Sequence, residues 1–180
     1  MEIRIASDIT EESIVDGPGF RTVIWTQGCS HRCEGCHNPH THDFNGGQLV
    51  DCNDLVEDIM KRSRFANVTF SGGDPFEQPE ACAYIARKLK EQGFRIWAYS
   101  GYTFEEIIKD NNKAEFLRQV DVLVDGRFEI GKRTLEPQYR FRGSKNQKII
   151  DVGLSLALGK TVEHELYVNI TSIMKDYINK

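Results

Sequence analysis

The stretch Cys29-Ser30-His31-Arg32-Cys33-Glu34-Gly35-Cys36 brings three thiols close together, directly after the apolar run Val23-Ile24-Trp25. A continuous apolar run of this kind is typical of a strand buried on both faces, as in a parallel sheet covered by helices. Because the cysteines begin soon after this run ends, we expect the thiols to lie in a loop at the carboxyl end of a buried strand. We call residues 29–36 the cysteine loop.

Strand and helix patterns alternate along the chain. Apolar runs predict strands around Ile3 and Ile5 and over 20–27, 68–70, 94–99 and 121–126, whereas apolar residues at helical spacing predict helices over 53–62, 79–92, 104–108 and 151–158. This alternation indicates an α/β protein with a parallel sheet and crossover helices. A closed eight-stranded barrel usually needs about 250 residues, so we expect a partial, open β/α barrel. Its functional loops should converge at the carboxyl ends of the strands.

The composition indicates one ordinary globular domain. The 180 residues carry a net charge of -4 and are 39% hydrophobic, which suits a single core and does not favour a basic nucleic-acid binder. We expect one domain over 1–180, with a core over about 14–158 and a C-terminal extension over 159–180. Apolar residues at helical spacing predict a docking helix in this extension, namely Ile170, Ile173, Met174, Tyr177 and Ile178.

The cysteine pattern and the absence of long apolar runs indicate the compartment. No apolar run approaches the roughly 20 residues of a membrane-spanning helix, and the first residues do not resemble a secretory signal. We therefore expect a cytoplasmic protein that does not bind membranes. Three clustered cysteines with two isolated ones, Cys52 and Cys82, do not resemble a disulfide framework. Reduced thiols that bind a metal fit better, with Cys52 and Cys82 as buried helix residues.

Two kinds of metal site remain open from the residues alone. A structural zinc ion takes four ligands, and its fourth ligand here would have to be a nearby histidine or the distant Cys52. An electron-transfer iron-sulfur cluster usually takes four cysteines, so three cysteines leave one iron without a protein ligand. An open coordination position is typical of catalytic metal sites, and it points to a bound substrate or cofactor.

Longer motifs resemble a known family. The pattern Cys29-x-x-x-Cys33-x-x-Cys36 resembles that of the radical S-adenosylmethionine enzymes, and residues 16–21, 27–29 and 35–39 resemble the glycyl-radical-enzyme activases within it. The segments 71–75, 100–103, 121–128 and 142–147 resemble the branch of these activases that acts on anaerobic ribonucleoside-triphosphate reductase. Together these matches span about 14–158, in order along the chain.

This resemblance implies a cofactor set and a reaction. It implies a [4Fe-4S] cluster on Cys29, Cys33 and Cys36, with S-adenosylmethionine bound to the open iron. Reductive cleavage of S-adenosylmethionine would give a 5'-deoxyadenosyl radical, which would remove hydrogen from a glycine of the reductase. The implied partners are anaerobic ribonucleoside-triphosphate reductase and a low-potential electron donor such as flavodoxin.

The resemblance also implies which loops hold S-adenosylmethionine. Its amino group would meet the loop of Gly72, Gly73 and Asp74, although the same residues also suit a tight turn in which Asp74 caps a helix. Backbone at Gly35, Cys36 and His37 would lie near the adenine, and Gly35 stands where many relatives have an aromatic cover. The remaining implied cofactor positions are Ser100, Gly101 and Asp125.

Other functional interpretations stay open at this point. Segment 127–148 holds seven Lys or Arg residues against two acids. It is either a solvated loop or a surface that steers the protein partner, with Phe128, Tyr139 and Phe141 as anchors. The alternatives to a glycyl-radical activase are a small-molecule radical enzyme like 7-carboxy-7-deazaguanine synthase, and a non-catalytic, zinc-stabilised binding module.

Overall fold

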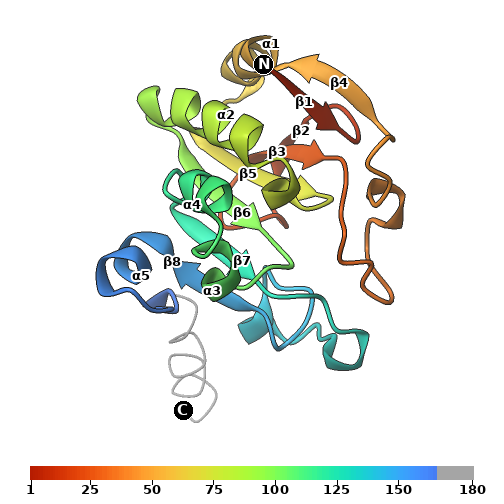
Figure 1. Ribbon diagram of the computed structural model, residues 1–180, viewed down its shortest axis with the longest axis vertical. Helices are drawn as coiled ribbons and strands as arrows, with labels where there is room; N and C mark the ends of the chain where they lie inside the picture. Colours follow the sequence, from red (N-terminus) through yellow and green to blue (C-terminus); the bar gives the residue numbers. More distant parts are fainter. Residues whose placement is uncertain (166–180) are drawn as a thin grey trace.

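The computed structural model describes residues 1–165, and the predicted docking helix lies outside these residues. It contains one mixed sheet of eight strands with helices packed against it (Figure 1). The strands are β1 Glu2–Ile5, β2 Thr10–Ser13, β3 Arg21–Thr26, β4 Gln48–Asp51, β5 Asn67–Gly72, β6 Arg95–Tyr99, β7 Val122–Asp125 and β8 Lys148–Asp151. The α-helices are α1 Cys52–Arg62, α2 Pro79–Glu91, α3 Phe104–Ile107, α4 Asn111–Leu117 and α5 Val152–Leu158.

Four parallel strands form the centre of the sheet. The path of the sheet is β4-β1-β3-β5-β6-β7-β8, and β2 pairs with β3 beside this path. Strands β3, β5, β6 and β7 are parallel, with Val23 opposite Thr69 and Thr69 opposite Trp97. These are the four strands that the continuous apolar runs predict, because most of their side chains are buried. The open sheet is compatible with a partial barrel.

The outer strands correct the prediction of an all-parallel sheet. Strands β1, β2, β4 and β8 are all antiparallel to their neighbours. The sequence pattern misses β2, β4 and β8 because each has four residues, of which at most two are apolar. In β8 only Ile149 and Ile150 are buried, between an exposed lysine and a half-buried aspartate.

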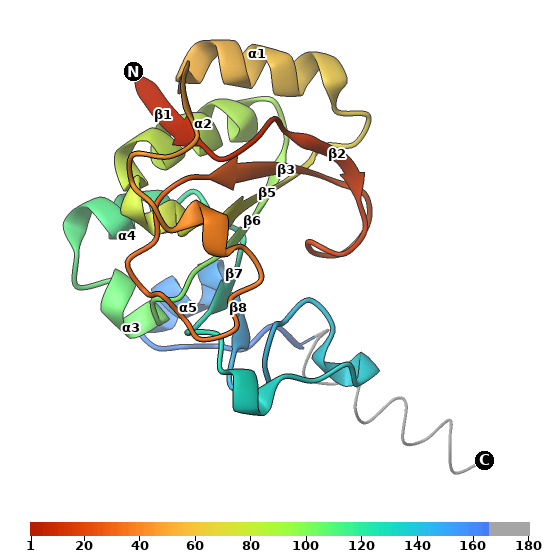
Figure 2. The ribbon, with the colours of Figure 1, turned by 90° about the vertical axis from the view of Figure 1, so that its right-hand side faces the viewer.

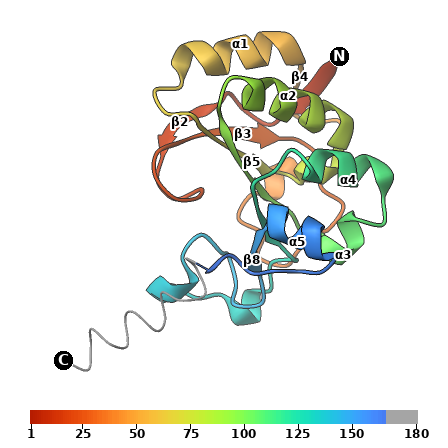
Figure 3. The ribbon, with the colours of Figure 1, turned by 90° about the vertical axis from the view of Figure 1, so that its left-hand side faces the viewer.

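The helices cover one side of the sheet. Helices α1, α2 and α4 lie side by side, as Figure 3 shows. The helices predicted over 53–62, 79–92 and 151–158 are confirmed as α1, α2 and α5 to within one residue at each end, whereas α4 was not predicted. The predicted capping box of Thr103 and Glu106 is present at the start of α3. The core between helices and sheet includes Phe70, Phe76 and Phe116, and the ring of Phe116 contacts the other two rings.

A buried arginine joins the amino ends of the central strands. Arg21, the first residue of β3, donates from Nε to Oγ1 of Thr69 at 2.7 Å and from a terminal nitrogen to the carbonyl of Val68 at 2.8 Å. Its guanidinium also lies over Trp97, 5.7 Å from the ring centroid. Gly17 has a φ of +119°, and a Cβ there would lie 2.8 Å from the Arg21 side chain. The Gly-containing turn before β3 therefore makes room for this arginine.

The carboxyl ends of the parallel strands gather the loops of interest on the opposite edge. In Figure 1 β3 and β5 point toward the cysteine loop, and Figure 2 shows this orange loop together with the teal segment that follows β7. Among the described residues, no helix is long and apolar enough to cross a membrane.

Candidate functional site

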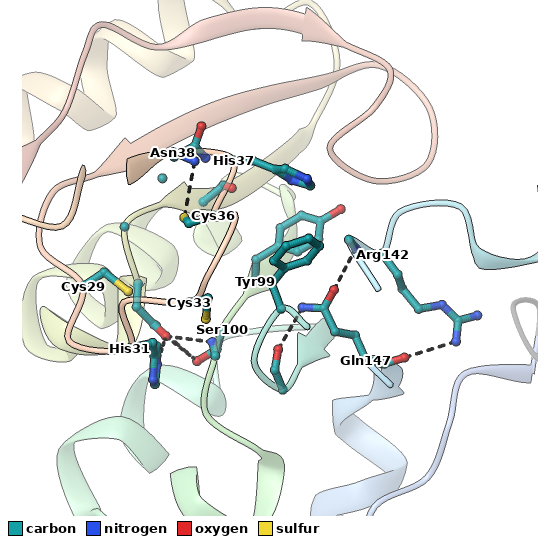
Figure 4. A pocket seen from close by; sticks show the side chains of 18 of the residues that line it. Cys29, His31, Cys33, Cys36, His37, Asn38, Tyr99, Ser100, Arg142 and Gln147 are labelled. Carbon is teal, nitrogen blue, oxygen red and sulfur yellow. Dashed lines mark hydrogen bonds and ion pairs between the residues drawn. The ribbon is translucent and has the colours of Figure 1, made fainter. Parts of the chain in front are cut away.

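A cavity of about 450 Å³ lies at the carboxyl edge of the sheet (Figure 4). Four loops that are distant in sequence line it, as the strand order predicts. The predicted site residues that line it are Cys29, Cys33, Cys36, His37, Gly72, Gly73, Asp74, Ser100 and Gly101. Two further predicted residues, Gly35 and Asp125, are not in this lining.

The three cysteines of the cysteine loop are free thiols at the cavity. Each is half-buried, and in Figure 4 their sulfur atoms lie around the same part of the cavity. The backbone N–H of Asn38 donates to Sγ of Cys36 at 3.4 Å, and hydrogen bonds to sulfur tune iron-sulfur clusters. Burial raises the pKa of the Cys29 thiol to about 11. Cys52 and Cys82 are fully buried in α1 and α2, as predicted.

The donor set fits a cluster with one open iron. Three thiols face one cavity, and the other two cysteines lie in the hydrophobic core. Within residues 1–165, no group of three or more His, Cys, Asp or Glu side chains is close enough to hold a single metal ion. A cubane cluster binds each thiolate at a separate iron, so its thiolates do not converge on one point. Cys29, Cys33 and Cys36 would hold such a cluster.

Glycines continue the strand pairing into the site. Beyond β3 and β5, the N–H of Gly73 donates to the carbonyl of Thr26 at 2.7 Å, and the N–H of Asp74 donates to the carbonyl of Gly28 at 2.9 Å. A Cβ added at Gly73 would lie 2.3 Å from that Gly28 oxygen, and one at Gly72 would lie 2.5 Å from the Thr26 oxygen. Only glycine permits this close approach. We call these two backbone hydrogen bonds the glycine seam. They hold the start of the cysteine loop against residues 72–74.

Asp74 connects three loops through its carboxylate. Oδ1 accepts from the N–H of Phe76 at 2.9 Å, so Asp74 caps a short 3-10 helix, which is the turn interpretation of the motif. Oδ2 accepts from the N–H of Gly101 at 2.8 Å, and the hydroxyl of Ser100 lies 3.1 and 3.0 Å from Oδ1 and Oδ2. The side chain is 1% exposed and also contacts His31. Sequence patterns did not indicate this histidine contact.

Asp125 lies at the end of β7 but is directed away from the cavity. Its Oδ2 accepts from the N–H of Phe104 at 2.8 Å, at the start of α3. Burial raises the pKa of this carboxyl above its ordinary value. In the described structure Asp125 thus stabilises the end of a helix, while its neighbour Gly126 lines the cavity.

Residues after β7 cover the end of the cysteine loop and the residue that follows it. Gly35 has a φ of +69° and lies under Ile130, because a Cβ at Gly35 would meet Cδ1 of Ile130 at 2.5 Å. The ring of Phe128 lies against His37, with centroids 4.9 Å apart, and Phe128 lines the cavity. The sequence pattern assigned Phe128 to a partner surface. It gave no sign that this aromatic side chain lies beside the cysteine loop.

The other aromatic residues of segment 127–148 pack within the chain. Phe141 contacts Trp97 with ring centroids 6.1 Å apart, and Tyr139 lies under the cations of Arg142 and Lys145. Leu135 is the apolar residue that this segment exposes most, at 91%. All three predicted aromatic anchors, Phe128, Tyr139 and Phe141, therefore make contacts within the chain.

Comparisons with known proteins agree with this donor set. The model of the family described as "4Fe-4S single cluster domain" matches residues 15–150. An anaerobic ribonucleoside-triphosphate reductase-activating protein of Enterobacteria phage T4 is 34% identical over 143 residues, which cover 75% of this chain and 86% of that protein. The protein of the same name from Escherichia coli K12 is 33% identical over 147 residues, 76% of this chain and 91% of its own length.

A second kind of relative matches a shorter part of the chain. The pyruvate formate-lyase-activating enzyme of Clostridium pasteurianum is 39% identical over 110 residues, which cover 56% of this chain and 46% of that enzyme.

Proposed function

The chain belongs to the family of the anaerobic ribonucleoside-triphosphate reductase-activating proteins, and from this premise we propose that it activates such a reductase by forming a glycyl radical on it. The chain is a radical S-adenosylmethionine oxidoreductase that uses a [4Fe-4S] cluster and S-adenosylmethionine. We further propose that the open sheet is a partial barrel of the radical S-adenosylmethionine type.

One observation carries this proposal. Three free thiols, and no other cysteine within the described residues, face a cavity that the Gly72–Asp74 and Ser100–Gly101 loops also line. A three-thiolate cluster leaves one iron for a small-molecule ligand. The cluster, when bound, supplies the electron that cleaves S-adenosylmethionine to methionine and the 5'-deoxyadenosyl radical that removes hydrogen from the partner's glycine.

The residues of the chain supply binding and positioning. We assign the amino end of S-adenosylmethionine to the backbone of Gly72 and Gly73, because glycines allow a ligand to approach the main chain closely. Ser100 and Gly101 border the same end of the cavity. Asp125 contributes indirectly, because its hydrogen bond to the N–H of Phe104 holds the end of β7 against the start of α3.

The adenine end of the site receives its cover from outside the cysteine loop. We assign the base to the space beside the backbone of Gly35, Cys36 and His37, with the ring of Phe128 as its aromatic neighbour. The contact between Phe128 and His37 supports this assignment, because it holds the ring of Phe128 at the cavity wall. Aromatic rings favour stacked or edge contacts with other flat rings.

The protein partner is assigned to the face formed by segment 127–148. Arg133 and Arg140 are exposed on it, and the described structure gives neither a salt bridge, whereas Lys132 pairs with Glu129 and Lys145 with Glu136. Arg140 also lies over the ring of Phe141, 5.3 Å from its centroid. Exposed cations without an ion-pair partner attract acidic partners and speed association. Three expectations remain predictions: an electron donor such as flavodoxin, a cytoplasmic location, and a single domain over 1–180.

The decisive experiment is anaerobic incubation of the reconstituted protein with S-adenosylmethionine, a reductant and an anaerobic ribonucleoside-triphosphate reductase. A glycyl radical on the reductase, seen by electron paramagnetic resonance, is the expected result. Pyruvate formate-lyase in place of the reductase is the matched comparison and should give little radical, because the chain spans less than half of the pyruvate formate-lyase-activating relative. Colourless protein with stoichiometric zinc would contradict the proposal, as would cleavage of S-adenosylmethionine that needs an added small molecule.

A further inference from the structure

His31 is a buried side chain within a loop that is otherwise largely exposed. It stands between the first two cysteines, yet only 3% of its side chain is accessible to solvent. Its Nε2 lies 2.8 Å from Oδ2 of Asp74, and because a carboxylate oxygen accepts, the imidazole donates. The ring also meets Tyr102 edge-on, with centroids 4.4 Å apart. Burial of a polar ring in a loop indicates a fixed position.

The neighbouring glycine makes room for this histidine. A Cβ added at Gly101 would lie 2.3 Å from Cδ2 and 2.6 Å from Nε2 of His31. Any other residue at this position would push the imidazole off Asp74. The glycine of the Ser100-Gly101 motif therefore has a steric role toward the cysteine loop.

The hydrogen bonds of Asp74 leave little capacity for a ligand. A carboxylate has about four acceptor positions. Here four groups donate to them: the N–H of Phe76, the hydroxyl of Ser100, the N–H of Gly101 and Nε2 of His31. An ammonium group would have to displace one of these donors to reach the carboxylate. Asp74 thus acts on the cysteine loop rather than directly on the cofactor.

A second polar contact holds the same part of the loop. The hydroxyl of Ser30 donates to Glu77, and the hydroxyl of Tyr102 donates to the same carboxylate oxygen at 2.9 Å. Two consecutive residues of the cysteine loop are thereby joined to residues 74–77. At the other end of the loop, Gly35 lies under Ile130, and His37, the residue after the loop, contacts Phe128.

We propose that His31 is a positioning residue that, through Asp74, sets the cysteine loop at the right distance and angle to the Gly72–Gly73 backbone. This inference rests on the proposed function, because it concerns where S-adenosylmethionine meets the open iron. The three thiols hold the cluster without His31. Loss of His31 therefore weakens the binding of S-adenosylmethionine more than it reduces cluster content.

The test compares His31→Leu, which removes the donor, with His31→Gln, whose amide offers a donor in its place. His40→Leu, at an exposed histidine a few residues further on, is the matched control. Iron per chain and the dissociation constant of S-adenosylmethionine are measured on each reconstituted protein. The electron paramagnetic resonance spectrum of the reduced cluster is recorded with and without the cofactor.

We expect His31→Leu to keep iron content near that of the wild type and to weaken S-adenosylmethionine binding about tenfold, because the cysteine loop is then no longer held in place beside the Gly72–Gly73 backbone. The spectral change that the cofactor causes in the wild type should be reduced in this variant. His31→Gln should restore most of the affinity, and His40→Leu should bind as the wild type does. Unchanged affinity in His31→Leu, or equal loss of iron and affinity, would overturn the inference.

A measurement on the cluster-free protein separates this inference from the proposed function. His31→Leu, Asp74→Asn and the double variant are unfolded with urea, and the effects on the free energy of unfolding are compared. Non-additive effects are expected because the two side chains share one hydrogen bond. Additive effects would overturn the inference whatever the protein's function. A wild-type protein that holds a cluster but binds no S-adenosylmethionine would overturn the proposed function and the inference with it.

Discussion

Ile130 lies so close over Gly35 that a Cβ atom at Gly35 would be 2.5 Å from its Cδ1. The family resemblance implies an aromatic side chain at this position in many relatives, and in this chain Ile130, from the segment after β7, occupies the space over Gly35. Residues 128–130 therefore cover Gly35 and the neighbouring His37 from a different part of the chain.

Replacing Gly35 by Phe should weaken S-adenosylmethionine binding, because the new side chain meets Ile130 and a φ of +69° costs a non-glycine residue about 1–2 kcal/mol. Adding Ile130→Ala should recover part of this loss by removing the atoms that the ring meets. Equilibrium binding to the single and double variants measures this recovery. If the losses of affinity caused by Gly35→Phe and Ile130→Ala simply add in the double variant, the contact between residues 35 and 130 does not determine how the loop is covered.

Single replacement of Cys29, Cys33 or Cys36 by Ala should abolish stable cluster binding, since a cubane held by two thiolates has two open irons. Iron and sulfide analysis after anaerobic reconstitution, with the visible absorbance, gives the readout. Cys82→Ala is the matched control, because this buried cysteine lies in α2 and its loss should lower stability by only about 0.5–3 kcal/mol without removing iron. A brown, active variant at any of the three loop positions would contradict the assignment.

Phe128→Ala should weaken S-adenosylmethionine binding roughly tenfold, as expected for an aromatic contact of about 0.5–1.5 kcal/mol plus its lost buried area. Iron content should stay unchanged, because no cysteine is touched. Phe65→Ala serves as the control, since Phe65 stacks on Phe20 and does not line the cavity. Methionine should bind equally to wild type and Phe128→Ala if Phe128 contacts only the adenine end.

Reversing the charges of Lys132, Arg133 and Arg140 together to Glu should weaken association with the reductase and make it less sensitive to salt. Cleavage of S-adenosylmethionine in the absence of the reductase should change little. The same reversal at Lys61, Arg87 and Lys88, which are exposed on α1 and α2, is the control for net charge. Equal effects of the two sets on association would remove segment 127–148 as the partner surface.

Asp125→Asn should stabilise the cluster-free protein at neutral pH. Burial raises the pKa of Asp125, so the folded protein binds this proton more tightly than the unfolded chain does. Wild-type stability therefore falls as the pH rises from the ordinary value of 3.8 through the raised folded value. Asparagine does not ionise and still accepts from the N–H of Phe104, so it avoids this loss.

Urea unfolding of Asp125→Asn and wild type at acid and at neutral pH provides the measurement. The advantage of the variant should be small in acid, grow through the titration window and remain constant above it. Glu57→Gln, at an exposed carboxylate on α1, should show no such growth. An advantage that is largest in acid would contradict the sign of the effect.

The central strands and the cavity residues were predictable because their signals are local. Val23, Val68 and Leu123 belong to short apolar runs that are typical of buried strands, and the carboxyl ends of parallel strands meet at one edge of the sheet. The cysteine loop and the Gly72–Asp74 loop therefore had to converge. The antiparallel strands at the edges were not predictable. β4 and β8 have four residues each, which is too short for a clear periodic pattern, and they form because a neighbouring strand offers hydrogen-bond partners.

The contacts of the site could not be derived from motif residues alone. The pairing of His31 with Asp74 joins residues that are 43 positions apart, and nothing in the spacing of the cysteine loop marks its histidine as buried. Asp125 has the type and position expected of a cofactor ligand, but its carboxylate binds the N–H of Phe104. Side-chain direction at a strand end depends on the next helix, which sequence patterns place only approximately.

The glycine seam between β3 and β5 has a consequence for chain length. Backbone hydrogen bonds run without interruption from Thr26 to Gly73 and from Gly28 to Asp74, so each residue has one fixed partner opposite it. An inserted or deleted residue on either side would shift all later pairs and turn the first thiol away from its two companions. Length changes in related proteins should therefore be absent from 26–29 and 72–74, and should collect instead around the exposed Leu135.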